Sequence, residues 1–380
     1  MKRILSYLYC VLLVVSCNID KNSKDQYVEL KITDSVISLN IPPSLSPTVR
    51  NVQYLSLDGM DYLVMRNMSL NGKLFVFNMD NMKLETIIDP QKEGPNGLGG
   101  QVDGSFIVNF DTIIVTIKGY HDVIHVIDRN ANLIKSINFD ISYNPYLPIS
   151  WINQNNTYYN NGYLVLPNWS ASSEGWQEIE KYSLGYSYDF KTGSQENYPV
   201  NYPRLVLDGS DNPNNASMFI INDNKTIVSF DHNHYLYVFN DSIWTPVYAK
   251  SQYIDRPLQT QYVNNIDFTD QIKRFIELPK YLSIVYDEYR KVYYRFVYPG
   301  EDVNDRDDIM KQHEFYKTFS IMILDEDFNV IGETLMPEYT FNTFAFFINR
   351  EGLWISTSHP DNPKFEEDVI NFRLLELGNI

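Results

Sequence analysis

The chain is poor in cysteine, and neither of its two cysteines falls where a folded domain would use one. Cys10 lies inside an apolar N-terminal run, and Cys17 follows directly after that run. The residues beyond position 17 contain no thiol, which excludes disulfides and cysteine metal ligands from the folded part. Stability must therefore come from a hydrophobic core, and 380 residues are enough to bury one.

Positive charge is also scarce. The chain has 31 Lys and Arg against 48 Asp and Glu, a formal net charge of −17. A protein this acidic repels phosphate backbones, so we expect no nucleic acid partner. Alanine is rare, whereas Tyr (29) and Phe (21) are abundant, and this composition favours strands over helices.

The N-terminal apolar run is too short to cross a bilayer. Ile4–Val15 follows the basic pair Lys2-Arg3 and falls well short of the ~20 residues that a spanning helix needs. It ends in Val14-Val15-Ser16-Cys17, which resembles a bacterial lipobox, whose cysteine is acylated and becomes the first residue. We therefore predict a lipoprotein signal peptide at residues 1–16 and a lipid attached to Cys17. An ordinary secretory signal that happens to contain a cysteine is the alternative.

The residues after the predicted lipid anchor suggest a location. Asn18 follows Cys17 and favours the outer membrane, but periplasmic and surface-facing orientations both stay open. The polar stretch 17–26 is predicted to be a tether, and 27–380 a single β-propeller domain.

Signatures of common enzymes are missing. We find no Gly-x-Ser-x-Gly and no His-Glu-x-x-His. The Gly-rich Pro90–Gly104 stretch lacks the Lys-Ser/Thr ending of a phosphate loop, so we expect its glycines to form tight turns at the rim of a channel. Because catalytic triads are defined by geometry, these absences do not exclude an enzyme.

A recurring hairpin is the main pattern that is present. An apolar strand, an Asn or Asp, a polar turn and a second strand occur at 73–88, and the same unit returns at 122–137 and 320–334. Recurrence of a hairpin within a longer unit is the mark of a repeat fold. The six predicted units span Val52–Ile88, Phe106–Ile137, Trp151–Val200, Met218–Tyr248, Tyr281–Leu335 and Phe344–Leu375.

The sixth unit has only three strands, and Tyr27–Ile41 at the other end of the chain can supply the fourth. The sequence thus predicts an all-β fold: a six-bladed β-propeller of four-stranded antiparallel blades, closed by the N-terminal strand. Seven blades would require Gln252–Leu278 to form a degenerate blade. That segment instead has a helical pattern from Phe268, with Thr269 or Asp270 as the N-cap.

The lipobox, the six units and the motif Glu93-Gly94-Pro95-Asn96-Gly97 together resemble anchored bacterial lipoproteins of unknown function. These are similar in fold to TolB-like six-bladed β-propellers. The resemblance covers nearly all of the chain after the signal and implies a fold, but it carries no catalytic residues.

Unequal connections point to one end of the predicted ring. First-to-second and third-to-fourth turns within each blade are short, and we call their end of the ring the short-turn end. Second-to-third and blade-to-blade connections hold all the long insertions, and we call theirs the long-loop end. Long loops on a rigid scaffold usually carry function, so a ligand- or partner-binding face is predicted at the long-loop end.

The predicted loops carry the candidate binding residues. His121, His232 and His359 are predicted in second-to-third loops, and the Trp169–Trp176 loop carries two tryptophans suited to sugar rings or a protein partner. Those tryptophans could equally pack over their own blade. His232-Asn-His234 is the pattern nearest to a metal site, but no carboxylate spacing supports it, so we predict no metal and no cofactor.

Two functions fit these features. The first is an outer-membrane-anchored, non-enzymatic lipoprotein that binds a glycan or an envelope protein. The alternative is a metal-assisted propeller hydrolase or lyase acting on extracytoplasmic glycans or small molecules.

Overall fold

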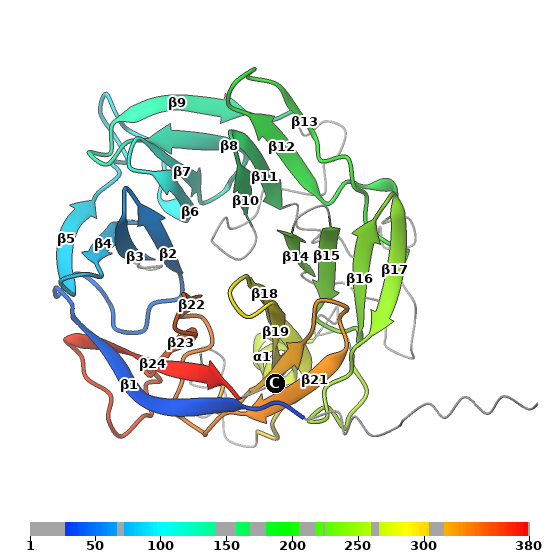
Figure 1. Cartoon of the computed structure of the whole chain (residues 1–380). Helices are drawn as coiled ribbons and strands as arrows, with labels where there is room; N and C mark the ends of the chain where they lie inside the picture. Colours follow the sequence, from blue (N-terminus) through cyan, green and yellow to red (C-terminus); the bar gives the residue numbers. More distant parts are fainter. Residues whose placement is uncertain are drawn as a thin grey trace, which may run out of the picture.

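The computed structural model describes residues 27–66, 72–140, 157–167, 180–204, 217–222, 225–259, 266–303 and 315–378. These residues form six four-stranded antiparallel sheets around a central axis, which is a six-bladed β-propeller (Figure 1). The predicted fold is confirmed. The predicted signal peptide, Cys17 and the tether lie outside the described residues.

Each blade runs from an inner to an outer strand (Figure 1). Blades one and two consist of β2 (Val52–Leu57), β3 (Met60–Arg66), β4 (Leu74–Asn78), β5 (Lys83–Ile88), then β6 (Val102–Asn109), β7 (Thr112–Ile117), β8 (Tyr120–Ile127) and β9 (Leu133–Asn138). Blades three and four consist of β10 (Tyr158–Asn160), β11 (Tyr163–Pro167), β12 (Gly185–Asp189), β13 (Gln195–Asn197), then β14 (Ser217–Asn222), β15 (Lys225–Phe230), β16 (Tyr235–Asn240) and β17 (Ile243–Tyr248). Blade five follows helix α1 (Phe268–Glu277) and consists of β18 (Lys280–Asp287), β19 (Val292–Tyr298), β20 (Ser320–Leu324) and β21 (Val330–Leu335). Blade six consists of β22 (Phe346–Ile348), β23 (Leu353–Ser356), β24 (Val369–Leu377) and the N-terminal β1 (Leu30–Asn40).

The Asp that follows the first strand of the recurring hairpin explains the shape of its turn. In the β8–β9 turn, Asp128 Oδ1 accepts hydrogen bonds from the amides of Asn130 and Asn132, both at 2.8 Å. Asp325 makes the same bonds to Asp327 and Asn329 in the β20–β21 turn. The residue before each Asn takes a left-handed conformation: φ is 60° at Ala131 and 65° at Phe328. The side chain thus replaces backbone partners in a tight turn, which explains why the pattern repeats.

The N-terminal strand closes the ring, as predicted. β1 pairs antiparallel with β24 from Leu30↔Leu377 to Asn40↔Val369. Just before β1, Val28 also forms a parallel bridge to Gly332 on β21 of blade five, and its amide donates to Ile331 O at 2.8 Å. The segment therefore ties blade five to blade six, and joins the two ends of the chain. In Figure 1, β1 lies along β24 at the rim of the ring.

The core lies between neighbouring blades. Tyr62, Leu74 and Val76 of blade one pack with Ile113 and Val115 of blade two, for example, because each sheet has apolar side chains on both faces. Leu98 of the Gly-rich Pro90–Gly104 loop joins the same cluster, and Asn96 Nδ2 donates to Asn132 Oδ1 at 3.0 Å. This loop therefore fills the seam between two blades. It turns at Gly94 and Gly99, with φ of 95° and 80°, and its place at the rim of a channel stays a prediction.

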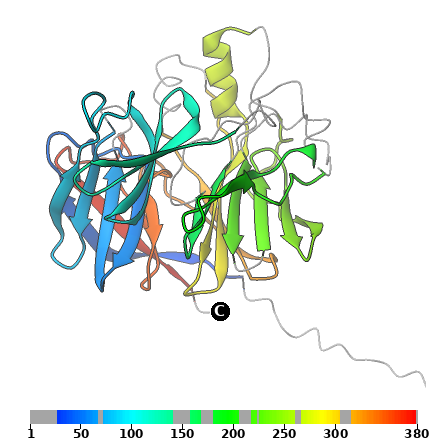
Figure 2. The same ribbon diagram turned by 90° about the horizontal axis from the view of Figure 1, so that it is seen from above.

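The two ends of the ring differ as the sequence predicted. At the short-turn end, β2 and β3 are separated only by residues 58–59, and β6 and β7 by residues 110–111. At the long-loop end, residues 249–279 connect β17 to β18 and contain α1, which stands out from the ring (Figure 2). Within the described residues, no helix is both long and apolar enough to span a membrane.

Two local predictions were wrong. His121 lies inside β8 and not in a loop, because the turn Lys118-Gly119 is tight, with φ of 83° at Gly119, and the strand resumes at Tyr120. The N-cap of α1 is Asp267, whose carboxylate accepts the Asp270 amide at 2.9 Å, and not Thr269 or Asp270.

Candidate functional site at the long-loop end

Lys280 is the first residue of β18, and its side chain is only 2% exposed. Its Nζ donates to the carbonyl of Phe275 in α1 at 2.7 Å and lies 3.2 Å from the centroid of the Phe275 ring. The rings of Tyr316 and Tyr298 lie at 5.0 and 5.2 Å from the same atom. Burial holds the pKa of this ammonium well below its usual range, partly opposed by the nearby Asp231. A lysine is thus enclosed by aromatic rings under a helix.

Arg295 lies in the middle of β19 and is fully buried. Its guanidinium lies 3.3 Å from the centroid of the Tyr281 ring. Its nitrogens donate to Ser229 Oγ at 3.0 Å and to the carbonyls of Ala249, Asn233 and His234 at 2.9, 2.9 and 3.3 Å. Burial lowers its pKa to about 10. Arg295 therefore fixes the loops after β15 and β17 against blade five.

Asp231 and His232 complete this group, which we call the buried-cation cluster (Asp231, His232, Lys280, Arg295). The Tyr281 amide donates to Asp231 O at 2.8 Å, so the start of β18 lies beside the loop after β15. Burial raises the pKa of Asp231 to about 8, although Lys280 and Arg295 oppose the shift. Burial and the nearby charge of Lys280 lower the pKa of His232 to about 3, and a hydrogen bond with the Pro279 backbone partly opposes this shift. At neutral pH the Asp231 carboxyl is mostly protonated and the His232 imidazole is neutral.

A second group of rings continues from this cluster toward blade six. Tyr316 lies 5.9 Å from Phe344, and the Arg50 guanidinium lies 5.2 Å from both the Phe344 and the Phe315 rings. The predicted site residue His359 packs edge-on against Phe315 at 5.9 Å. Aromatic rings and cations thus alternate from α1 to blade six.

Buried polar atoms that make no hydrogen bond of standard geometry gather at the same end. Among the described residues, such atoms belong to Arg66, Thr116, Tyr186, His232, Glu301, Thr343 and His359. Each of these side chains lies where a second strand ends, where a third strand begins or in a long-loop connection. A buried polar group without a partner costs about 1–3 kcal/mol, so proteins tend to keep such groups where another molecule can satisfy them.

The predicted site residues lie in different environments, and some lie outside the described residues. His232 and His359 lie in second-to-third loops as predicted, but they are 0% and 2% exposed, so their rings line the protein interior and do not form a surface. Burial lowers the pKa of His359 as well. His121 lies in β8. Trp169 and Trp176 lie outside the described residues, as does Cys17, and their roles stay predictions.

Sequence reasoning missed Asp231, Lys280 and Arg295. One signal was available for Arg295, because it interrupts the otherwise apolar run Val292–Tyr298, where a central strand should be buried. No comparable signal marks Lys280, which stands at a strand end where a solvated lysine is ordinary. In the described residues, no group of three His, Cys, Asp or Glu side chains is arranged to hold a metal ion.

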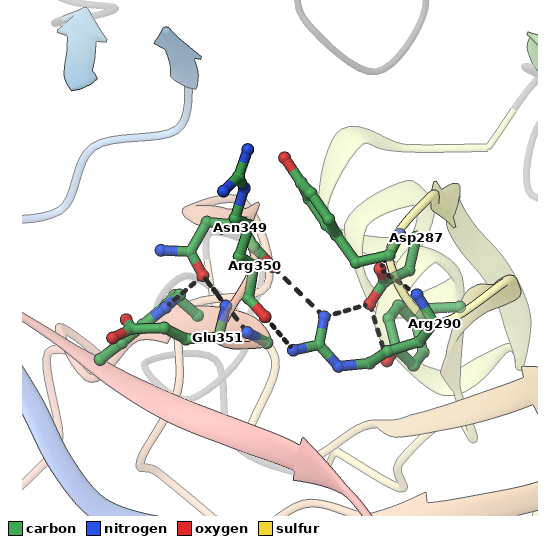
Figure 3. Close-up of polar contacts among 9 residues, drawn as sticks. Asp287, Arg290, Asn349, Arg350 and Glu351 are labelled. Carbon is green, nitrogen blue, oxygen red and sulfur yellow. Dashed lines mark hydrogen bonds and ion pairs between the residues drawn. The ribbon is translucent and has the colours of Figure 1, made fainter. Parts of the chain in front are cut away.

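The short-turn end is built differently. Figure 3 shows the Arg290 guanidinium between Asp287 of its own turn and the Asn349–Glu351 turn of blade six. Nη1 pairs with Asp287 Oδ2 at 3.0 Å and donates to Asn349 O at 3.2 Å, while Nη2 donates to Arg350 O at 2.9 Å. Asn349 Oδ1 in turn accepts the Glu351 amide at 2.9 Å. These groups satisfy each other, so this contact holds two blades together and has little left to offer a ligand.

The fold and the two ends define a class: the protein is a six-bladed β-propeller. Residues 18–335 match the family described as "Domain of unknown function (DUF4221)", and the chain belongs to that family. No curated protein matches the chain.

Solved structures agree with this assignment. A member of the DUF4221 family from Bacteroides vulgatus is 24% identical, with a TM-score of 0.80, and the match covers 94% of this chain and all (100%) of that chain. A predicted exported protein from Bacteroides fragilis is 11% identical, with a TM-score of 0.53, over 93% of this chain and 96% of that chain. At these identities both show the fold alone.

Proposed function

We propose that this protein is a lipoprotein anchored in the outer membrane through Cys17, whose long-loop end binds a glycan or an envelope protein and which has no catalytic activity of its own. The observation that carries the binding role is the concentration of buried charges and unsatisfied polar atoms at the long-loop end. The short-turn contact at Asp287–Arg290 shows that this chain can pair such groups where only stability is needed. A binding function explains why buried polar atoms without a hydrogen bond of standard geometry gather at one end.

The loops support the same end. Helix α1 projects there, with Phe268 72% exposed at its first turn. The Trp169–Trp176 stretch lies outside the described residues. It falls between β11 and β12 in the sequence, and we predict that it contributes to the same end. Exposed aromatic side chains supply large contact area at low entropic cost, which suits both a sugar and a protein partner.

The proposed anchor is supported by the lipobox and by a protein of similar structure. The B. fragilis propeller is described as exported, and the same destination suits a chain that begins with a signal-like segment. Replacing the acceptor, Cys17→Ala, removes the lipid and should release the protein from the membrane, because in this proposal the lipid and not the acidic domain holds it there. Fractionation of cells decides the point: a variant that stays in the membrane pellet contradicts the anchor.

Capture from outer-membrane extracts tests the binding role. Partners captured by the wild-type protein are identified, and binding is then measured for Trp169→Ala and Trp176→Ala. Loss of a central aromatic anchor costs ~2 kcal/mol or more, about thirtyfold in affinity, while the melting temperature should change little. Asp111→Asn in a short turn is the matched control and should bind as the wild type does. Equal binding by all these variants would remove the tryptophans from the site.

A further inference from the structure

The buried-cation cluster has more hydrogen-bond donors than acceptors. Lys280 carries three N–H groups, and among the described residues the one hydrogen bond it makes is to Phe275 O. Within the described residues neither ring nitrogen of His232 makes a hydrogen bond of standard geometry, although the ring is 0% exposed and has the Pro279 backbone as a hydrogen-bond partner. Arg295 donates to backbone carbonyls and to Ser229, and among the described residues no carboxylate accepts a hydrogen bond from it, although Asp231 and Glu333 act on its charge from a distance.

Asp231 is the acid of the cluster, and it does not pair with these cations. Among the described residues its carboxyl makes no hydrogen bond and no ion pair, although Lys280 and Arg295 both lie close enough to act on it electrostatically. Asp231 is also the one member of the cluster that is partly exposed, since the other three are at most 2% exposed. Asp231 is therefore the member of the cluster that lies nearest to the surface.

We propose that the buried-cation cluster is a binding site for a small oxyanion, the carboxylate or phosphate group of a larger ligand, which reaches Lys280 and His232 past Asp231. This inference rests on the proposed binding role of the long-loop end and names the ligand chemistry for it. An oxyanion supplies acceptors to the N–H groups of Lys280 that make no hydrogen bond within the described residues, and a negative charge to two buried cations.

Other ligand classes fit less well. A cation would meet Lys280 and Arg295, and a neutral sugar would leave both charges uncompensated. Among the described residues neither Lys280 nor Arg295 forms an ion pair with a carboxylate, and Asp231 and Glu333 act on them only from a distance, so a negative ligand would join two incompletely compensated charges. Titratable groups face the site from every neighbouring element. They are Lys280, Arg295, Tyr281, Tyr298 and Glu333 from blade five, Asp231 and His232 from the loop after β15, and Tyr316 before β20, whose pKa burial raises.

Calorimetric titration of the purified protein without its signal peptide tests the site. The probes are inorganic phosphate, glucuronate and, as a neutral control, glucose. We expect phosphate or glucuronate to bind at pH 6 and glucose not to bind, and the stronger of the two anions distinguishes a phosphate from a sugar carboxylate as the source. Folded wild-type protein that binds neither anion overturns the proposal.

Two lysine variants locate the binding. Lys280→Met keeps the length of the side chain and removes its charge, so anion affinity should fall at least tenfold. Lys135→Met is the matched control, because Lys135 also lies over aromatic rings, 4.5 Å from Phe190 and 4.8 Å from Tyr188, but between blades two and three. Wild-type affinity in Lys280→Met would place the anion elsewhere.

Asp231→Asn gives a second test that does not depend on the folding of Lys280→Met. Above pH 8 the wild-type carboxylate is ionised and repels the anion, whereas asparagine stays neutral. At pH 9 the variant should bind at least threefold more tightly than the wild type, and at pH 6 within twofold of it. Equal affinities at pH 9 contradict the site. If anions fail to bind while Trp169→Ala still abolishes partner capture, the inference is wrong and the proposed function stands.

Discussion

Val28 lies directly against Gly332, so that the carbonyl of Val28 occupies the space into which any side chain at position 332 would extend. The bridge between these two residues joins the N-terminal segment to blade five, before β1 completes blade six. The N-terminal segment therefore holds two neighbouring blades, and a single glycine permits the contact.

A side chain at position 332 should loosen that closure. Gly332→Val would push Val28 off β21 and strain the closing strand, at a cost of about 1–3 kcal/mol typical of overpacking. Val330→Ala, on the same strand but partly exposed, should cost less than about 0.5 kcal/mol. Denaturant unfolding of both variants measures the difference, and equal stabilities would show that the bridge contributes nothing.

Removing the closing segment should affect the whole ring. Deletion of residues 27–41 exposes the long edge of β24 and removes Leu30, Ile37 and Leu39 from the inter-blade core. Because every blade packs against its neighbours, we expect the entire protein to lose stability. A truncated protein that melts cooperatively at the wild-type temperature would contradict closure by β1.

Arg290 should matter far more to stability than a similar ion pair on the surface. Its partner Asp287 is 0% exposed, so Arg290→Ala leaves a buried carboxylate without its cation, at a cost of about 3–5 kcal/mol. Arg256 pairs with Asp302 with both side chains exposed, and Arg256→Ala should cost about 0–1 kcal/mol. Chemical denaturation compares the two. A small effect at Arg290 would mean that Tyr294 and the turn amides alone satisfy Asp287.

Asp231 should make the protein less stable as the pH rises. Its pKa is about 8 in the folded protein and about 4 when unfolded, so the folded state holds the proton more tightly across that interval. Stability associated with this group is therefore full below pH 4 and is lost as the pH rises toward 8. Asp231→Asn should be more stable than the wild type at pH 8 by more than about 1 kcal/mol, and the difference should shrink at pH 5. Exposed Asp111→Asn is the control, and a pH-independent difference would contradict the burial of Asp231 as its cause.

Much of the fold could be predicted from sequence because its causes are local or periodic. Alternating apolar residues define the strands, the Asp128 and Asp325 turns repeat the same side-chain bonds, and three strands left over at Phe344–Leu375 required a fourth. The Val28–Gly332 bridge could not be predicted, because it depends on how far the segment before β1 reaches past blade six.

The site was harder to predict than the fold. Asp231, Lys280 and Arg295 lie far apart in the sequence and become neighbours only when blades four and five pack. The histidines were chosen for their loops, but loop position does not decide burial: the short connection between β15 and β16 turns His232 inward. The end of the ring was predictable because connection lengths can be counted, whereas the chemistry at that end depends on packing.

One measurement tests most directly whether the long-loop end is the binding face. The chain has no thiol after Cys17, so single cysteines can be placed at either end of a form lacking residues 1–17 and capped with a bulky maleimide polymer. Phe268→Cys marks the long-loop end, and Ile243→Cys, which is 66% exposed beside the β16–β17 turn, marks the short-turn end. Capping position 268 should abolish binding of the captured partner, and capping position 243 should leave it unchanged. Loss of binding on capping 243 with none on capping 268 would contradict the account.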